Sequence, residues 1–113
     1  MSGTHNDAVL VVELAKLASM SGGPEAVRAV FADDFDPNAA ETTDPHVQTV
    51  LGFETVGTLV KNGLLDRDLV LDWLWVAGPW ERVGPAAKRA REKAGVPNLY
   101  ENFEALAVGS LVS

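Results

Sequence analysis

The sequence has 113 residues, no cysteine, two histidines and a formal net charge of −7, a composition that predicts one domain able to fold without disulfides or thiolate metal sites. Two imidazoles are too few for an ordinary catalytic zinc site, so we expect neither a metal nor another cofactor. The sequence has no basic leader and no apolar run of about 18 residues, and we therefore expect a soluble cytoplasmic protein with no membrane partner.

Two helices are predicted in the first third of the chain. Residues 1–6 are expected to be frayed, and apolar residues then recur at helical spacing over about residues 7–20, where Gly22-Gly23 would end the helix. Pro24 suits the first position of a short second helix that extends to Phe31.

An acidic connection and a longer helix follow. Residues 33–44 are rich in Asp, Pro, Asn and Thr, so this segment is predicted to be a solvated loop. Asp44 can cap a third helix and Pro45 can begin it, and its apolar stripe extends to a stop at Asn62-Gly63.

Two glycines, Gly52 and Gly57, lie inside this third predicted helix. Each makes a helix less stable by about 1 kcal/mol than alanine would, so another part of the molecule is expected to approach the backbone there. The Trp-rich segment further along the chain is the expected neighbour. A ligand slot lined by Glu54 is the alternative interpretation.

All three tryptophans fall within eight residues of a fourth predicted helix, which Asp66 would cap. Apolar residues follow one another at intervals of about three or four along this helix: Leu69, Val70, Trp73, Val76, Ala77, Trp80, Val83 and Ala87. Pro79 lacks a backbone donor, so a kink or break is expected near Gly78-Pro79. Cations and then Gly95 would end the segment.

A capping-box variant from Asn98 to Glu101 predicts a last short helix over about residues 98–108. No alternation typical of strands and no internal repeat is present. The predicted fold is therefore all-α: a single domain, residues 1–113, built as a compact bundle of five or six helices with a proline-kinked or broken Trp-rich fourth helix.

The tryptophans carry the most specific hypothesis about function. At roughly 100° per residue, Trp73 and Trp80 share one face of a helix, whereas Trp75 is displaced from Trp73 by about 200°. A helix in so small a domain is expected to bury one such face, which leaves Leu71, Trp75 and Pro79 as an exposed surface for a protein partner or a second copy in a homodimer. The alternative is that neighbouring helices enclose all the rings within a monomer.

A pocket between the third and fourth helices is the competing hypothesis, with Glu54, Asp72 and Arg91 as its polar groups for a small ligand or for catalysis. Asp72 is expected either to pair with a cation or a tryptophan N–H, or to lie solvated on the outer face of its helix. No nucleophile-elbow serine and no glycine-rich phosphate loop is present, so no motif supports catalysis.

Basic residues gather in segment 79–95, which has a net charge of +3, while residues 1–78 have a net charge of −8. The acidic remainder would repel phosphate, and no aromatic platform is interleaved with the cations, so no nucleic-acid partner is expected. Salt bridges within the molecule and compensation of the helix dipole account for these residues.

Several short motifs resemble those of a known family. They are Phe53-Glu54-Thr55-Val56-Gly57-Thr58-Leu59-Val60, Gly63-Leu64-Leu65, Leu69-Val70, Trp80, Arg91 and Tyr100-Glu101-Asn102-Phe103-Glu104. Over roughly residues 45–107 the chain thus resembles small bacterial helical proteins of the domain-of-unknown-function family numbered 4760. The resemblance implies a bacterial helical domain and, because no activity is assigned to the family, no functional residue. The tryptophans, and not the resemblance, lead us to expect a protein interaction or self-association module, with the small-ligand or catalytic pocket as the alternative.

Overall fold

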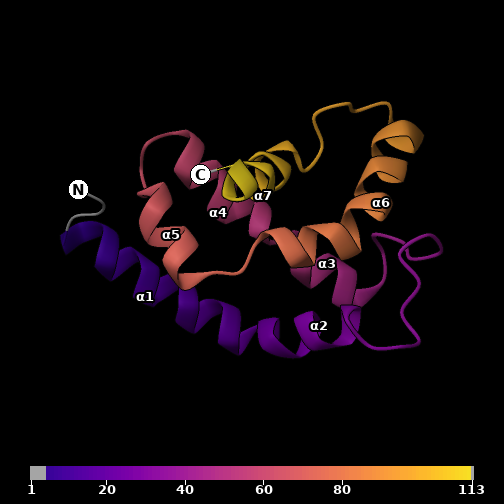
Figure 1. Ribbon diagram of the computed structural model, residues 1–113, viewed down its shortest axis with the longest axis horizontal. Coiled ribbons are helices and arrows are strands. Elements are labelled where there is room, and N and C mark those ends of the chain that lie inside the picture. Colours follow the sequence, from indigo (N-terminus) through magenta and orange to yellow (C-terminus); the bar gives the residue numbers. More distant parts are fainter. Residues whose placement is uncertain (1–4, 113) are drawn as a thin grey trace.

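The computed structural model describes residues 5–112, with side chains from residue 6 to residue 109, and within these bounds the chain forms seven α-helical segments and no strand. They are α1 (His5–Met20), α2 (Gly23–Val30), α3 (Pro45–Leu51), α4 (Phe53–Lys61), α5 (Arg67–Trp73), α6 (Ala77–Ala94) and α7 (Glu101–Val112). Figure 1 shows α1 and α2 along one edge of the molecule, with α4 and α7 near the centre. The predicted all-α class is confirmed. Residues 1–4 of the segment expected to be frayed lie outside the described residues.

Two of the predicted helix starts are confirmed and have a clear cause. Asp44 Oδ1 accepts a hydrogen bond from His46 N at 3.0 Å at the start of α3. Asp66 Oδ2 accepts a hydrogen bond from Leu69 N at 3.0 Å at the start of α5. In each case a carboxylate satisfies a backbone donor that the helix itself leaves without a partner.

Gly52 divides the third predicted helix into α3 and α4. A Cβ atom at this position would lie 2.9 Å from Thr49 O, so the tight joint favours glycine over any larger residue. Residues 45–61 therefore form one bent helix made of two pieces. If these pieces are counted together, the described chain contains six helices, in agreement with the predicted number.

The Trp-rich segment is broken, as predicted, but at a different place. The sequence predicts the break near Gly78-Pro79, whereas the structure has it at residues 74–76, where Leu74 is extended with φ −120° and ψ 126°. Gly78 and Pro79 instead lie in the first turn of α6. The first amides of a helix have no partner within the helix, so the missing N–H of proline costs nothing there.

The second half of the Trp-rich segment, α6, continues through Pro85 and ends at Gly95, which has the left-handed φ of 68° expected of a C-cap glycine. Figure 1 shows the ribbon of α6 changing direction partway along its length. A proline inside a helix removes one backbone hydrogen bond and clashes with the preceding turn, which bends the helix.

The last helix begins three residues later than predicted. Asn98 lies in a turn in which its carbonyl oxygen accepts a hydrogen bond from Glu101 N at 3.1 Å. Tyr100 has a left-handed φ of 61°, and α7 starts at the next residue. The prediction that Asn98 begins the helix is therefore wrong, because the chain is still turning at that point.

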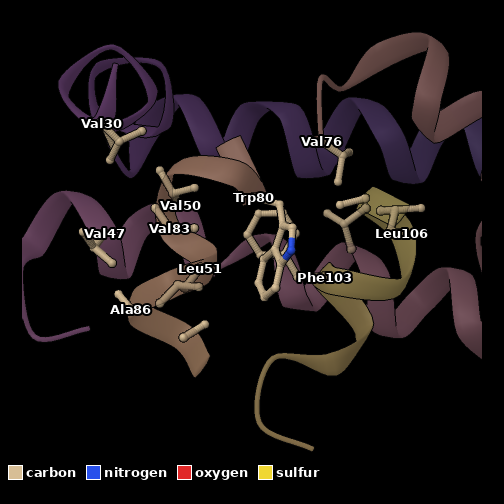
Figure 2. Packing of buried hydrophobic residues seen from close by; sticks show 14 of the residues in the cluster. Val30, Val47, Val50, Leu51, Val76, Trp80, Val83, Ala86, Phe103 and Leu106 are labelled. Carbon is tan, nitrogen blue, oxygen red and sulfur yellow. The ribbon is translucent and has the colours of Figure 1, made fainter. Parts of the chain in front are cut away.

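The core is centred on Phe103, which is fully buried. The Trp80 ring meets the Phe103 ring edge-on, with centroids 5.0 Å apart (Figure 2). The centroid of the Phe53 ring lies 5.2 Å from that of Phe103. Buried apolar residues from α2 to α7 surround this cluster: Ala26, Val30, Val47, Val50, Leu51, Val56, Leu65, Val70, Val76, Val83, Ala86, Ala87, Leu106 and Ala107. None of the helices in the described part of the chain has the length and apolar character needed to cross a membrane.

Candidate interaction surface

A pair of stacked aromatic rings lies exposed beside the Trp-rich segment. Trp75, in the linker between α5 and α6, and Phe31, the residue that ends α2, have ring centroids 5.0 Å apart and ring planes inclined by 17°. Trp75 is 60% exposed and Phe31 is 39% exposed. We call these two residues the aromatic surface. Stacking restricts the orientations that both rings can adopt, although each still faces water.

Gly78 allows the indole of Trp75 to lie against the backbone. A Cβ atom at Gly78 would lie 2.0 Å from Trp75 Cζ2 and 2.4 Å from its Cε2, so any side chain at this position would displace the ring. The absence of a side chain at Gly78 therefore allows the Trp75 ring to occupy its position. The sequence prediction assigns Gly78 to a kink and misses this role.

Arg82 of α6 orders the turn that carries Phe31. Its Nε donates a hydrogen bond to Val30 O at 2.6 Å, and its Nη2 donates one to Phe35 O at 3.3 Å. The guanidinium carbon lies 5.6 Å from the centre of the Phe31 ring and 5.2 Å from that of the Phe35 ring. A planar guanidinium can bind carbonyl oxygens with its edge while its face contacts aromatic rings, so one residue fixes both rings and backbone.

Arg89 holds the acidic loop further along. Its Nη2 donates hydrogen bonds to Pro37 O, at 3.0 Å, and to Ala40 O. Residues 33–44 contain no helix and connect α2 to α3. Arg82 and Arg89 thus bind within the molecule, but to carbonyl oxygens and not through the predicted salt bridges.

Exposed carboxylates lie close to the aromatic surface along the chain. Asp33, Asp34 and Asp36 lie within five residues after Phe31, and all of them are exposed. Asp72, in α5, lies three residues before Trp75 and is also exposed. Along the chain these four carboxylates outnumber Arg82, whose guanidinium contacts the Phe31 ring, and a surface with a net negative charge attracts a basic one.

The structure separates the three residues predicted to form the exposed surface. Trp75 is exposed, Leu71 is partly buried against the core, and Pro79 is fully buried. Pro79 is thus excluded from any exposed surface, because the first turn of α6 packs into the core. Phe31, from a different helix, takes its place beside Trp75. Sequence reasoning missed Phe31 because its spacing from the tryptophans along the chain carries no local signal.

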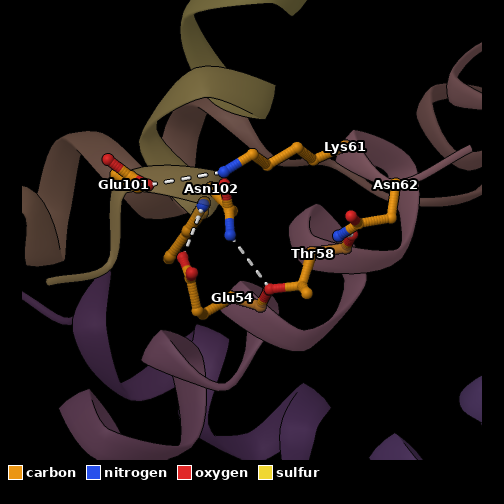
Figure 3. Close-up of polar contacts among 7 residues, drawn as sticks. Glu54, Thr58, Lys61, Asn62, Glu101 and Asn102 are labelled. Atoms are coloured by element: carbon orange, nitrogen blue, oxygen red, sulfur yellow. Dashed lines mark hydrogen bonds and ion pairs between the residues drawn. The ribbon is translucent and has the colours of Figure 1, made fainter. Parts of the chain in front are cut away.

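Two of the three polar groups predicted for a pocket, Glu54 and Arg91, instead hold α7 against its neighbours. Glu54 of α4 accepts, through Oε1, a hydrogen bond from Phe103 N at 2.8 Å (Figure 3). Phe103 is the third residue of α7, so this carboxylate caps α7 from a neighbouring helix and complements the positive end of its dipole.

Gly57 of α4 is the point of closest approach to α7. A Cβ atom at Gly57 would lie 2.4 Å from Asn102 O. Beside it, Asn102 Nδ2 donates to Thr58 Oγ1 at 3.1 Å, and Lys61 Nζ lies 3.6 Å from Glu101 Oε1 (Figure 3). We call these contacts the α4–α7 joint. The prediction that a neighbour approaches this glycine is correct, but the neighbour is the last helix and not the Trp-rich segment.

Two arginines hold other parts of α7 and the turn before it. Arg91 of α6 pairs with Glu104 Oε1 at 2.8 Å, and its Nε donates to Leu99 O at 2.6 Å. Arg67 of α5 donates from Nη2 to Gly109 O in the second half of α7. A cation near the carbonyl end of a helix and the Glu54 carboxylate at its start both complement the helix dipole.

Within the part of the chain that the structure describes, Glu54, Asp72 and Arg91 form no hydrogen bond or ion pair with one another. Glu54 and Arg91 contact α7 from α4 and α6, while Asp72 lies exposed on α5. An apolar cavity of about 180 Å³ does lie between the bent helix 45–61 and the end of α5, beneath α1. Its lining consists of Leu14, Leu17, Ala18, Ser21, Gly23, Thr49, Gly52, Phe53, Thr55, Val56, Trp73 and Leu74. This volume is below the roughly 300–1,000 Å³ of typical ligand pockets, and no charged group lines the cavity.

Among the side chains that the structure describes, no three His, Asp or Glu residues gather so that they could hold a metal ion. A family model described as Domain of unknown function (DUF4760) matches residues 6–110 of the chain. No curated protein and no solved structure gives a significant match. The family match extends well beyond residues 45–107 and takes in both the aromatic surface and the α4–α7 joint.

Proposed function

Because the chain belongs to the DUF4760 family, whose description assigns no activity, we propose a function from the surface of the molecule. The domain is a protein interaction module, and its aromatic surface binds an apolar side chain from a protein partner that also carries basic residues. A bacterial cytoplasmic setting is part of this proposal.

The proposal rests on the side chain of Trp75, which is exposed but held in position. Its indole is 60% exposed, yet Phe31 stacks on it and Gly78 lies directly against it. A ring that is already ordered loses little conformational entropy when a partner binds, so more of the contact energy appears as affinity. Tryptophan is also among the residues that contribute most at protein interfaces.

The charge around the rings supports a basic partner. Asp33, Asp34 and Asp36 lie in the loop that begins at Phe31, and the whole chain has a net charge of −7. Lysine or arginine residues beside an apolar anchor would be attracted to these carboxylates, which favours encounter in the correct orientation. Acidic partners would be repelled.

The experiment uses short synthetic peptides in which a leucine or proline anchor lies between lysines, and matched peptides with glutamates in place of the lysines. Trp80 is 9% exposed and Trp73 is partly buried, so quenching of tryptophan emission by acrylamide reports mainly on Trp75. We expect a lysine-flanked peptide to protect Trp75 from quenching and the glutamate peptides to have no effect.

Trp75→Ala should weaken binding of that peptide, measured by calorimetry, by about tenfold or more. Leu64→Ala is the matched control, because Leu64 is 62% exposed in the connection between α4 and α5, and it should bind as the unchanged protein does. Equal binding of both peptide classes, or binding that survives Trp75→Ala in a folded protein, would contradict the proposal.

A further inference from the structure

The outer face of α1 is largely apolar and exposed, and of its residues only Leu17, at one edge, also lines the cavity beneath the helix. Four of its apolar side chains have exposed fractions of 49% to 85%: Val9, Val12, Leu17 and Met20. Glu13 and Lys16 lie among them as an exposed ion pair, with Oε1 and Nζ 3.5 Å apart. At roughly 100° per residue these six residues span an arc of about 140°, which we call the outer face of α1. Val11 and Leu14, on the opposite side, pack against the core.

A helix with apolar residues on both sides is usually covered on both sides. The inner side of α1 meets its own core, so the outer face remains to be covered. The arrangement of residues on that face indicates by what.

The outer face is self-complementary when read in opposite directions. Its midpoint lies between Leu14 and Ala15, and each apolar residue has an apolar counterpart at equal distance on the other side: Val9 with Met20 and Val12 with Leu17. At the centre, the acidic Glu13 has the basic Lys16 as its counterpart. This order is the one that a twofold axis perpendicular to a helix requires, because such an axis reverses the direction of the second helix.

We infer that α1 pairs antiparallel with α1 of a second copy of this chain. Along the central line, Val9 then lies opposite Met20 of the second copy, and Glu13 lies opposite Lys16 of the second copy, with the reciprocal contacts generated by symmetry. Val12 and Leu17 flank this line on opposite sides and cover it. A parallel pair would place Glu13 opposite Glu13 and Lys16 opposite Lys16, which like-charge repulsion disfavours.

The dimer is expected to be weak and reversible. α1 has 16 residues and is therefore about 24 Å long, so one helix pair buries less than the roughly 800 Å² per partner of a standard interface. Sedimentation equilibrium over chain concentrations from about 1 µM to about 1 mM covers the range in which such a complex dissociates.

Charge reversal supplies the test. Glu13→Lys and Lys16→Glu each place like charges opposite one another in the antiparallel dimer, so each variant alone should dissociate about tenfold more readily or worse. An equimolar mixture of the two single variants should recover dimers, because every contact between copies then joins opposite charges. If the variants dissociate only because each has lost the Glu13–Lys16 ion pair within its own helix, mixing them restores nothing, because both chains in the mixture still lack that pair.

The double variant Glu13→Lys/Lys16→Glu should also dimerise as the unchanged chain does. A chain that sediments as a monomer over the whole range, single variants that dimerise unimpaired, or a mixture that stays monomeric would each overturn the inference. Trp75→Ala should leave dimerisation unchanged, and the charge reversals should leave peptide binding at the aromatic surface unchanged, so this inference and the proposed function can fail separately.

Discussion

Replacing Gly57 with alanine tests whether α7 packs directly on the backbone of α4. Helix propensity alone predicts that Gly57→Ala stabilises the protein by about 1 kcal/mol, because alanine restricts the unfolded chain more than glycine does. The structure predicts the opposite sign. An added Cβ would lie 2.4 Å from Asn102 O, 2.6 Å from Asn102 C and 3.0 Å from Phe103 N, all of them backbone atoms that cannot turn away.

The size of the effect follows from the movement that this clash demands. Ordinary contact would require α7 to move outward by about 1 Å, which costs about 1–3 kcal/mol as overpacking. The same movement lengthens the 2.8 Å hydrogen bond between Phe103 N and Glu54 Oε1 and loses about 1 kcal/mol of capping energy. After the gain in helix propensity is subtracted, Gly57→Ala should lower the free energy of unfolding by about 1–3 kcal/mol.

Thermal unfolding followed by circular dichroism measures this directly, and the expected fall in Tm is about 4–15 °C for a domain of this size. Thr55→Ala, on an exposed position of the same helix, is the matched control and should change Tm little. A Tm for Gly57→Ala that equals or exceeds that of the unchanged protein would refute the packing of α7 on α4 and the reasoning built on it.

Two further predictions concern the same core and the aromatic surface. Glu54→Ala should destabilise the protein by about 1–2 kcal/mol, measured from the midpoint of denaturant unfolding, because Phe103 N loses its acceptor. Glu54→Gln keeps an oxygen acceptor and should recover most of this loss. Equal losses for the two variants would count against a capping role. Trp80→Ala should cost about 3–5 kcal/mol because its ring packs on Phe103, whereas Trp75→Ala should cost less than about 1 kcal/mol because its ring is mostly exposed; similar values in chemical unfolding would show that this contrast is wrong.

Local features of the fold could be predicted from sequence because their partners are close along the chain. Asp44, Asp66 and Gly95 each act on backbone groups within a few residues, so residue type and spacing suffice. The position of the break in the Trp-rich segment could not be predicted in the same way. A proline reads as a helix breaker, but Pro79 lies in a first turn, where it is tolerated.

The candidate site could be predicted only in part. Exposure of Trp75 is correct, but the expected reason, its angle on a continuous helix, is wrong, because Trp75 lies in a linker. Its neighbour Phe31 and the capping partner of Glu54 come from distant segments. Spacing in the sequence carries no information about such contacts, since they depend on how whole helices are placed.

The dependence of α4 and α6 on α7 has a consequence for synthesis. Translation delivers α7 after the other six helical segments, and only then do Gly57 and Glu54 of α4 and Arg91 of α6 meet their partners. Until that moment the rings of Phe53 and Trp80 lack the aromatic neighbour that covers them. A nascent chain that stalls before residue 101 therefore exposes an incomplete apolar core to chaperones and proteases. Once α7 has been synthesised, it can pack on α4 and α6 and cover that core.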